Sequence, residues 1–512
     1  MRFAKEHEWC AGGINNAPVT QLTSFPIQPI VKQLINSGPS TNRIDVTFMG
    51  DGYTKDQQDL FFGDIQRLVD EMWSGGAFDG VLPLFNVWAV FVPSREAGIG
   101  TGDTPRDTVF GLYRDGTELR GIYPSYPEVA RAACKATGPN GCDFPSLIGN
   151  DAYYGGLGGE FTIGTSSKTT GSLVLRHEFG HTLVNEGEEY DGGEAYFGSN
   201  SAYELKNIKW KKWLSEPPFG KFKLKEQRNT IRVQDYSWYD LAKGPYQLEF
   251  SSDGTYNRWY IRITASGVEQ DGSLEVYLDG KRMSWQSHGN LDRGFHDWTS
   301  HDVGFTNGTH KLEFRQGFPP TNTTSPIRQL CSVTVHEYAA EPEYHFDPDY
   351  VGAFPTYSLS GKKSYRPTHE SCLMRNMTSP VFCPVCKEGL FLSLLDRISL
   401  IDSINTSCEP QSGGDDDSDE WGAKSLHVAR LNLLKLAHLR EKGKRVPGEK
   451  YNIKWIRDGV AVNELDDKEE VRVKAKDAVG DWSVSVRIST PLVRDDPDGM
   501  TVSRMAFVWH RC

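Results

Sequence analysis

The sequence lacks the long apolar segments and the positive charge that would direct a protein to membranes or nucleic acids. It contains no run of about 20 apolar residues, the length needed to cross a bilayer, so we expect no membrane span. Acidic residues outnumber basic ones by 68 to 56, and the formal net charge is −12. Phosphate backbones and anionic lipid surfaces attract positively charged proteins, so neither is an expected partner.

The first residues, Met1-Arg2-Phe3-Ala4-Lys5, also lack the apolar stretch of a signal peptide. Other features nevertheless favour an extracellular protein with a truncated or processed N-terminus. Cys134 and Cys142 flank a Gly-Pro-Asn-Gly turn, and this spacing predicts a disulfide that closes a small loop. Four Asn-x-Ser/Thr sequons are candidate glycosylation sites, at Asn307, Asn322, Asn376 and Asn405.

The total of nine cysteines is odd, which leaves one thiol free or paired outside the chain. The sequence leaves open the pairing of the other seven, which are Cys10, Cys331, Cys372, Cys383, Cys386, Cys408 and Cys512. The spacing Cys383-Pro-Val-Cys386 also suits a zinc knuckle or a redox site. We favour a single metal per chain, because only one such close pair is present.

At 512 residues the chain is too long for one hydrophobic core, and about three domains are expected. Residues 43–49 alternate as a strand, residues 55–74 show helical spacing of apolar side chains, and residues 85–92 form an apolar run typical of a buried strand. This order predicts an α/β layer. A Gly-rich segment, 155–159, leads into a short edge strand at 160–164.

The middle of the chain changes character, because period-2 apolar patterns replace helical ones after about residue 220. We predict an inserted β-sandwich of jelly-roll type, with a glycan as a candidate ligand, and a C-terminal immunoglobulin-like β-sandwich. The expected division is an N-terminal extension (1–43), a first catalytic part (44–220), the insert (221–340), a second catalytic part ending in an apolar helix (341–408), an acidic linker (409–423), and a helix at 424–441 leading into the last β-domain (424–512).

Chemistry is concentrated in the motif His177-Glu178-Phe179-Gly180-His181, on a helix that should begin near residues 170–172. Residues four apart lie on the same helix face, so the two imidazoles converge on one point. Neutral His nitrogens are good zinc ligands. Glu178 lies beside that face, where its carboxylate can take a proton from a zinc-bound water.

Two histidines leave zinc short of one protein ligand. Gly187 is expected to end the helix, and the acidic residues of Glu188-Glu189-Tyr190-Asp191 follow at once. We predict that Glu188, the first side chain after the turn, returns to the metal. Glu189 is held in reserve.

These residues resemble the IgA peptidase M64 family, which reads His-Glu-x-Gly-His and then Leu-x-Asp-Glu-Tyr. The resemblance covers roughly residues 44–220 and 341–408. The other segments that carry it are Phe48-Met-Gly-Asp-Gly-Tyr53, Gly155-Gly-Leu-Gly-Gly159, Ile208-Lys-Trp210, Tyr365-Arg-Pro367, Cys372-Leu-Met-Arg375 and Phe382-Cys-Pro-Val-Cys386.

The resemblance implies an α/β zincin fold of metzincin type, with Met374 as the Met-turn beneath the zinc. It makes His177 and His181 ligands and Glu178 the general base. Glu188 stands where the family usually has Asp, and Gly187 stands where metzincins usually have their last His.

The sequence therefore predicts a secreted zinc endopeptidase with one zinc per chain and a peptide or protein as substrate. Glu178 would deprotonate the attacking water, and the substrate would pair antiparallel with the edge strand at 160–164. The alternative is an adhesion protein that binds glycans or proteins and whose zincin domain has lost activity. The intact Glu178 counts against it, because a purely structural zinc needs no base.

Overall fold

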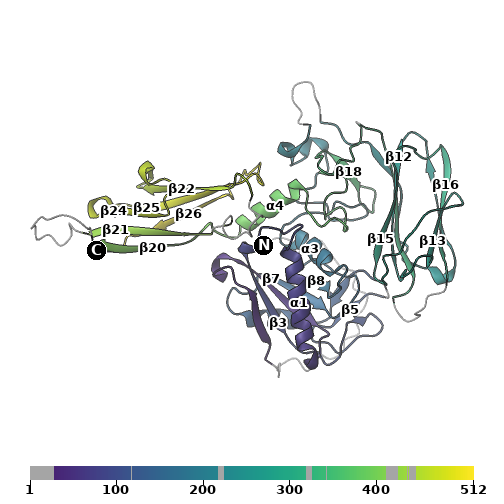
Figure 1. The fold of residues 1–512 in the computed structure, drawn as a ribbon, viewed down its shortest axis with the longest axis horizontal. Helices are drawn as coiled ribbons and strands as arrows, with labels where there is room; N and C mark the ends of the chain where they lie inside the picture. Colours follow the sequence, from purple (N-terminus) through teal and green to yellow (C-terminus); the bar gives the residue numbers. More distant parts are fainter. Residues whose placement is uncertain are drawn as a thin grey trace, which may run out of the picture.

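The computed structural model describes residues 28–116, 118–216, 224–318, 326–341, 343–410, 425–434, 436 and 446–511. Within these ranges the chain is mostly β-sheet, with only four α-helices. Figure 1 shows an α/β part between two β-sandwiches, which lie at opposite ends of the molecule. None of the described helices is long and apolar enough to cross a membrane.

The α/β part is built on a five-stranded sheet in the order β1-β3-β2-β7-β8. Neighbouring strands are parallel except for β1, which pairs antiparallel with β3. The strands predicted near 43–49 and 85–92 are therefore present. The bounds are β1 Ile30–Ile35, β2 Ile44–Asp51, β3 Phe85–Phe91, β7 Phe144–Gly149 and β8 Thr162–Thr165.

Strand β1 corrects one prediction, because residues 1–43 were expected to be an N-terminal extension that precedes the α/β layer. Residues 30–35 instead form an edge strand of the main sheet. None of its six residues is fully buried. A strand with so little buried surface has no clear alternation of apolar and polar residues, so the sequence pattern did not reveal it.

Helices cover both faces of this sheet because side chains alternate along each strand. Val46 and Phe48 of β2 pack with α1 (Gln58–Trp73) and α3 (Gly171–Thr182), whereas Met49 packs on the other face with α2 (Pro127–Cys134). Helix α1 follows a capping box between Thr54 and Gln57, in agreement with the helix predicted at 55–74. A small sheet, β4 Gly100–Thr101, β5 Leu112–Arg114 and β6 Ile122–Pro124, lies nearby.

Strand β8 is an edge strand, as predicted, but its outer edge is already paired. The Leu157 amide donates to the Ile163 carbonyl (3.2 Å), and the Ile163 amide donates back to Leu157 (2.9 Å). The expectation that a substrate would pair with residues 160–164 is therefore wrong at Ile163. The Gly-rich segment 155–159 covers that edge.

The region from β9 to β17 is a sandwich of two antiparallel sheets. One sheet has the order β10-β17-β12-β15, with β9 also on β17, and the other has the order β11-β16-β13-β14. Its core comes from inward-facing residues of both sheets, such as Ile263 and Leu312. The bounds are β9 Asn229–Asp235, β10 Tyr239–Asp240, β11 Tyr246–Ser252, β12 Arg258–Ser266, β13 Leu274–Leu278, β14 Lys281–Arg282, β15 Gly294–Ser300, β16 Gly308–Gln316 and β17 Gln329–Tyr338.

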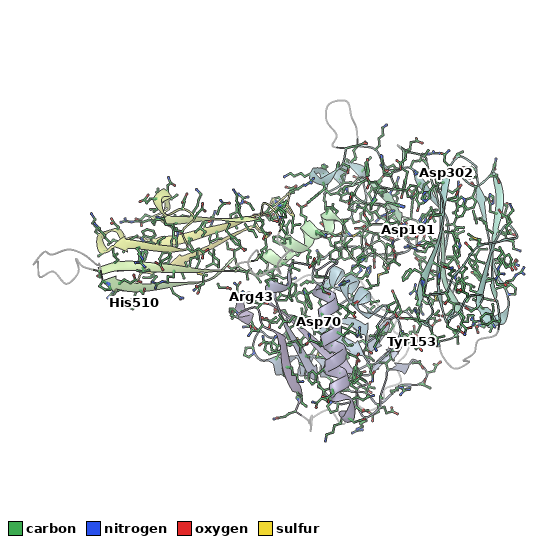
Figure 2. All side chains as sticks on the ribbon, in the orientation of Figure 1. Arg43, Asp70, Tyr153, Asp191, Asp302 and His510 are labelled. Carbon is green, nitrogen blue, oxygen red and sulfur yellow. A yellow bond between two sulfur atoms is a disulfide. The ribbon has the colours of Figure 1, made fainter. Side chains whose placement is uncertain are left out.

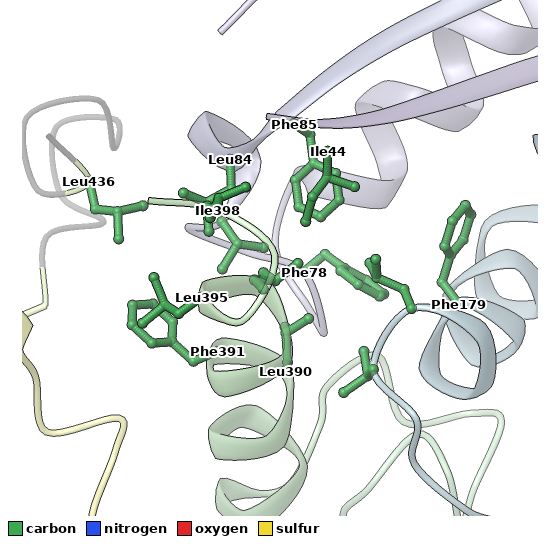
Figure 3. Close-up of a cluster of buried hydrophobic side chains, with 14 of the residues drawn as sticks. Ile44, Phe78, Leu84, Phe85, Phe179, Leu390, Phe391, Leu395, Ile398 and Leu436 are labelled. Carbon is green, nitrogen blue, oxygen red and sulfur yellow. The ribbon is translucent and has the colours of Figure 1, made fainter. Parts of the chain in front are cut away.

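After this sandwich the chain returns to the α/β part through β18 (Phe354–Tyr357), β19 (Lys363–Arg366) and α4 (Pro384–Leu395). Figure 3 shows Leu390 of α4 and Phe179 of α3 in one apolar cluster, with Phe78 between them. The same core continues into the C-terminal sandwich through residues such as Leu436 and Trp455. Helix α4 therefore joins the α/β part to the last domain.

The C-terminal sandwich contains two antiparallel sheets, β20-β21-β24 and β23-β22-β25-β26. Its bounds are β20 Ile401–Pro410, β21 Ser425–Leu433, β22 Lys450–Arg457, β23 Val460–Ala461, β24 Glu470–Lys474, β25 Trp482–Ser489 and β26 Val502–Phe507. Two predictions were wrong here. The domain begins with β20 rather than at 424, and the helix predicted at 424–441 begins as strand β21.

The physical reason is that the apolar residues of 425–433 fit both the helical period of about 3.6 residues and the strand period of two. Pairing with β20 and β24 selects the strand. The acidic segment, predicted as a linker at 409–423, joins two strands that pair with each other. Its residues 411–423 lie outside the described part, as do 424, 435 and 437–441 of the predicted helix.

Candidate metal centre and substrate cleft

Helix α3 brings His177 and His181 together, as their spacing predicts. Their Nε2 atoms are 3.2 Å apart. Each Nδ1 faces a backbone carbonyl, that of Leu373 at 3.4 Å for His177 and that of Glu186 at 2.8 Å for His181. A proton on each Nδ1 makes these hydrogen bonds, which leaves the two Nε2 lone pairs facing each other. Such outer hydrogen bonds orient histidine ligands in metal sites.

The turn after α3 differs from the prediction. The helix ends at Thr182 rather than at Gly187. The left-handed residue is Asn185, with φ 60°, and the Glu186 amide then donates to the Gly180 carbonyl (3.0 Å). Gly187 is needed for a different reason, because a Cβ there would lie 2.4 Å from the Phe197 backbone nitrogen.

This turn places the Glu188 carboxylate against both imidazoles. Its Oε1 lies 3.0 Å from the His181 Nε2, and its Oε2 lies 3.3 Å from the His177 Nε2. Ligands about 2.0–2.1 Å from a tetrahedral zinc are separated by roughly 3.3 Å, which is close to all three spacings. Three acceptors therefore converge at the separation that a bound cation requires, and the residues fit zinc.

The electrostatics of the group agree with that geometry. Burial lowers the pKa of His181, but the Glu188 carboxylate outweighs burial and raises this pKa to about 9. Burial would raise the pKa of Glu188, yet the two imidazoles hold it well below its ordinary value. The cluster thus favours positive charge at its centre, whether a proton or a metal ion supplies it.

Glu178 lies beside the three converging residues, on the side of the Gly-rich segment. Burial raises the pKa of its carboxyl above the ordinary value, against the lowering effect of the two histidines. A Cβ on Gly158 would lie 2.8 Å from Glu178 Oε2, and a Cβ on Gly156 would lie 2.3 Å from a Val174 methyl. Glycines at these positions therefore let the segment approach the helix and the carboxylate.

Met374 lies under the motif helix. A Cβ on Gly180 would come within 2.6 Å of the Met374 sulfur, so the glycine of the motif is needed for this contact. Met374 is fully buried, and its carbonyl accepts a hydrogen bond from the Glu189 amide (3.0 Å). The loop that carries Met374 therefore supports both the helix and the turn after it.

The other two acidic residues of the turn point away from the histidines. Glu189 is buried, and its Oε1 accepts a hydrogen bond from Asn200 (3.0 Å). Asp191 accepts hydrogen bonds from Arg375 (2.5 Å) and from His336 of β17 (2.9 Å). Figure 2 shows Asp191 where the β9–β17 sandwich meets the α/β part. The reserve residue Glu189 is thus outside the His177–His181–Glu188 group.

A cavity of about 290 Å³ opens beside the motif. One wall contains His177, Glu178 and Glu188, and the other comes from strands β12, β15 and β17 of the inserted sandwich. Sequence reasoning did not identify this second wall, because no local pattern shows which side chains of a sandwich face another domain. Its polar and aromatic members include Tyr260, Arg262, Thr264, Phe295, Thr334 and His336.

The cysteines and sequons are placed as follows. Cys134 and Cys142 form a disulfide, in agreement with the sequence prediction. Cys408 is also disulfide-bonded, and the free thiols of the described residues are Cys331, Cys372, Cys383 and Cys386. Among the sequons, Asn307 and Asn405 are exposed, Asn376 is half-buried, and Asn322 lies outside the described residues.

The fold and the convergent residues define a candidate metal-dependent hydrolase. The model of the family described as IgA Peptidase M64 matches residues 32–235, which include the motif helix and the turn after it. Over these residues the chain is similar to the M64 peptidase family. No curated protein matches the sequence.

Solved structures add no argument about function. Similar chains include a GH2 beta-galacturonidase from Eisenbergiella tayi, with 11% identity over 51% of this chain and 35% of that chain at a TM-score of 0.14. An exo-beta-1,3-galactanase from Phanerochaete chrysosporium matches with 9% identity over 28% and 30% of the two chains at a TM-score of 0.13. The chain thus spans about a third of the length of these proteins, and such low scores carry no inference.

Proposed function

We propose that the protein is a secreted zinc-dependent endopeptidase. The observation that carries this proposal is the convergence of His177 Nε2, His181 Nε2 and the Glu188 carboxylate, which places one oxygen against each imidazole. With protons on both Nδ1 atoms, all three are acceptors, and a shared cation resolves their repulsion. The similarity of residues 32–235 to a peptidase family supports a peptide or protein substrate.

Zinc held by these three side chains would polarise the scissile carbonyl and lower the pKa of a bound water. Glu178 would take a proton from that water during attack and pass it to the leaving amine. The raised pKa of Glu178 suits this exchange, because it makes the carboxylate a stronger base. The Leu373 and Glu186 carbonyls would hold the imidazoles in position throughout.

Tyr154 is the best candidate for stabilising the oxyanion. Among the other tyrosines of the cavity, Tyr190 donates to Glu188 and Tyr236 donates to the Asp191 carbonyl. Tyr260, on the sandwich wall, interacts electrostatically with Arg262, Glu370 and Asp297 rather than with Glu178. Tyr154 lines the cavity and interacts electrostatically with Glu178 and Glu188. A free phenol close to the base can donate to the negative oxygen that forms in the transition state.

The substrate is proposed to lie between the Gly-rich segment 155–159 and the inserted sandwich. Arg293 offers a recognition element in this cleft, because its guanidinium stacks on Tyr154 and Trp238 and makes no ion pair with a carboxylate of the described residues. Its Nη1 and Nη2 donate to the Leu119 carbonyl (3.5 Å) and to Thr264 Oγ1 (3.3 Å), which leaves its charge without a carboxylate partner among the described residues. A substrate carboxylate would supply the missing partner. We also propose a glycan as a ligand of the inserted sandwich.

The architecture supports a zincin of metzincin type. The mixed sheet, the motif helix and the buried Met374 beneath Gly180 agree with that fold, and Met374 is proposed as the Met-turn. The jelly-roll and immunoglobulin-like classes are likewise proposed for the two sandwiches, from their paired antiparallel sheets.

The test is cleavage profiling of the purified chain against a peptide library, with and without a chelator. Glu178→Ala should keep its zinc and its fold and lose at least roughly 10²–10⁴-fold in rate, the usual contribution of a general base. Glu160→Gln is the matched control, since Glu160 is exposed and pairs with Arg131. An active Glu178→Ala protein refutes the mechanism. A zinc-loaded wild type that cleaves nothing favours the adhesion alternative.

A further inference from the structure

A second group of metal-binding side chains lies on the far side of the same turn. Glu189, Cys372, Cys383 and Cys386 place one ligand atom each within 4.8 Å of the others. All four residues are buried, none exposing more than 2% of its surface. They come from three separate segments, which are the turn after α3, the loop before Met374 and the start of α4.

The separations within this group are those of a tetrahedral site. The sulfurs of Cys372 and Cys386 are 3.6 Å apart, and the Cys386 sulfur lies 3.2 Å from Glu189 Oε1. Sulfurs bound to zinc at about 2.3 Å are roughly 3.8 Å from each other, and a carboxylate oxygen is somewhat closer. Cys383 and Cys386 have the Cys-x-x-Cys spacing that is common in structural zinc sites.

The polar surroundings also point to a bound cation. Glu189 Oε2 is buried and has no hydrogen-bond partner. A buried carboxylate is costly unless it is paired or binds a metal, and the thiols around it carry no positive charge. The Cys383 amide lies 3.4 Å from the Cys372 sulfur and donates to it, while the Arg366 guanidinium acts electrostatically on Glu189. Such outer contacts stabilise thiolate ligands.

We propose that Glu189, Cys372, Cys383 and Cys386 bind a second, structural zinc ion in a closed four-ligand site. Four protein ligands leave no position open for water, so this ion would not take part in hydrolysis. Three sulfurs and one oxygen favour zinc over magnesium or calcium. The expected content then rises from the one zinc predicted from the sequence to two.

The second ion would hold the first site in shape. Glu188 and Glu189 are consecutive, and their side chains point to opposite sides of the backbone. Fixing Glu189 to the Cys372 loop and to α4 would therefore fix the direction of Glu188 and the position of Met374. The inference concerns a different set of ligands from the proposed function, and the two can fail separately.

Elemental analysis of the purified full chain tests the count. The wild type should hold two zinc ions, Cys383→Ser one, His181→Ala one, and the double variant none. Cys331→Ser is the matched control, because Cys331 is a buried free thiol on β17 outside the group, and it should keep both ions.

Cobalt substitution gives a readout that does not depend on the Cys383 variant folding. Cobalt in the four-ligand site should show the sulfur-to-metal charge-transfer absorption of thiolate ligands, and His181→Ala should keep it. The proposal is overturned if this absorption is absent, or if non-reducing peptide mapping finds a disulfide among Cys372, Cys383 and Cys386.

The zinc counts also separate the two sites. A wild type with one zinc that His181→Ala loses removes the second site and leaves the proposed function intact. A wild type with one zinc that only Cys383→Ser loses keeps the four-ligand site and removes the zinc of the proposed function.

Discussion

Asp191 provides a quantitative test of how the inserted sandwich and the metal turn are held together. Its carboxylate is 6% exposed and accepts hydrogen bonds from Arg375 (2.5 Å), His336 (2.9 Å) and the Tyr357 amide (2.8 Å). Asp191→Asn keeps the shape and removes the charge. Removing one partner of a buried ion pair costs about 3–5 kcal/mol. Arg375 keeps a second carboxylate, that of Glu370 at 2.8 Å, so we expect the lower end, about 3 kcal/mol.

The pH dependence should change as well. Burial would raise the pKa of Asp191, but Arg375 and His336 hold it well below its ordinary value. A carboxyl whose folded pKa is depressed stabilises the protein above its unfolded pKa of about 3.9, and that contribution is lost as the pH falls through the folded pKa. The wild type should therefore lose stability below about pH 4, and Asp191→Asn should lack the loss of stability that protonation of Asp191 causes.

The assay is urea unfolding of the zinc-loaded chain, followed by release of zinc to a chromogenic chelator. Asp107→Asn is the control, because its pair with Arg95 is exposed, with 85% of the Arg95 side chain and 60% of the Asp107 side chain accessible. An exposed pair contributes about 0–1 kcal/mol. If Asp191→Asn behaves like Asp107→Asn in both stability and pH dependence, the role assigned to the buried pair is wrong.

Four further predictions follow from the site. Glu188→Gln should weaken zinc binding more than about 100-fold, which exceeds the effect of removing a residue that only hydrogen-bonds a ligand. An unchanged zinc affinity in a competition titration would exclude Glu188 as a ligand. Tyr154→Phe should lower kcat by about 10²–10³-fold with full zinc content, and an unchanged kcat would exclude it as oxyanion donor. Arg293→Gln should lower kcat/KM about 10-fold or more for peptides with acidic side chains and spare neutral peptides. Peptide mapping of natively produced protein should find the Cys134–Cys142 disulfide and glycans on some of Asn307, Asn322, Asn376 and Asn405, whereas free thiols and bare asparagines would contradict secretion.

The sequence by itself determined the features that depend on local geometry. The spacing of His177 and His181 places both imidazoles on one helix face wherever that helix packs. The short loop between Cys134 and Cys142 brings the two sulfurs together without help from the rest of the chain. The strands and the helix between residues 43 and 92 also follow from their own apolar periodicity.

Only the tertiary structure decided which carboxylate joins the histidines and what Glu189 does instead. The helix ends five residues earlier than Gly187 suggested, and Asn185 makes the left-handed turn, so the direction of Glu188 depends on contacts with the Met374 loop. The Glu189–Cys372–Cys383–Cys386 group and the second wall of the cleft both join segments far apart in the chain. Such contacts depend on how domains pack, which periodicity and spacing along one segment do not encode.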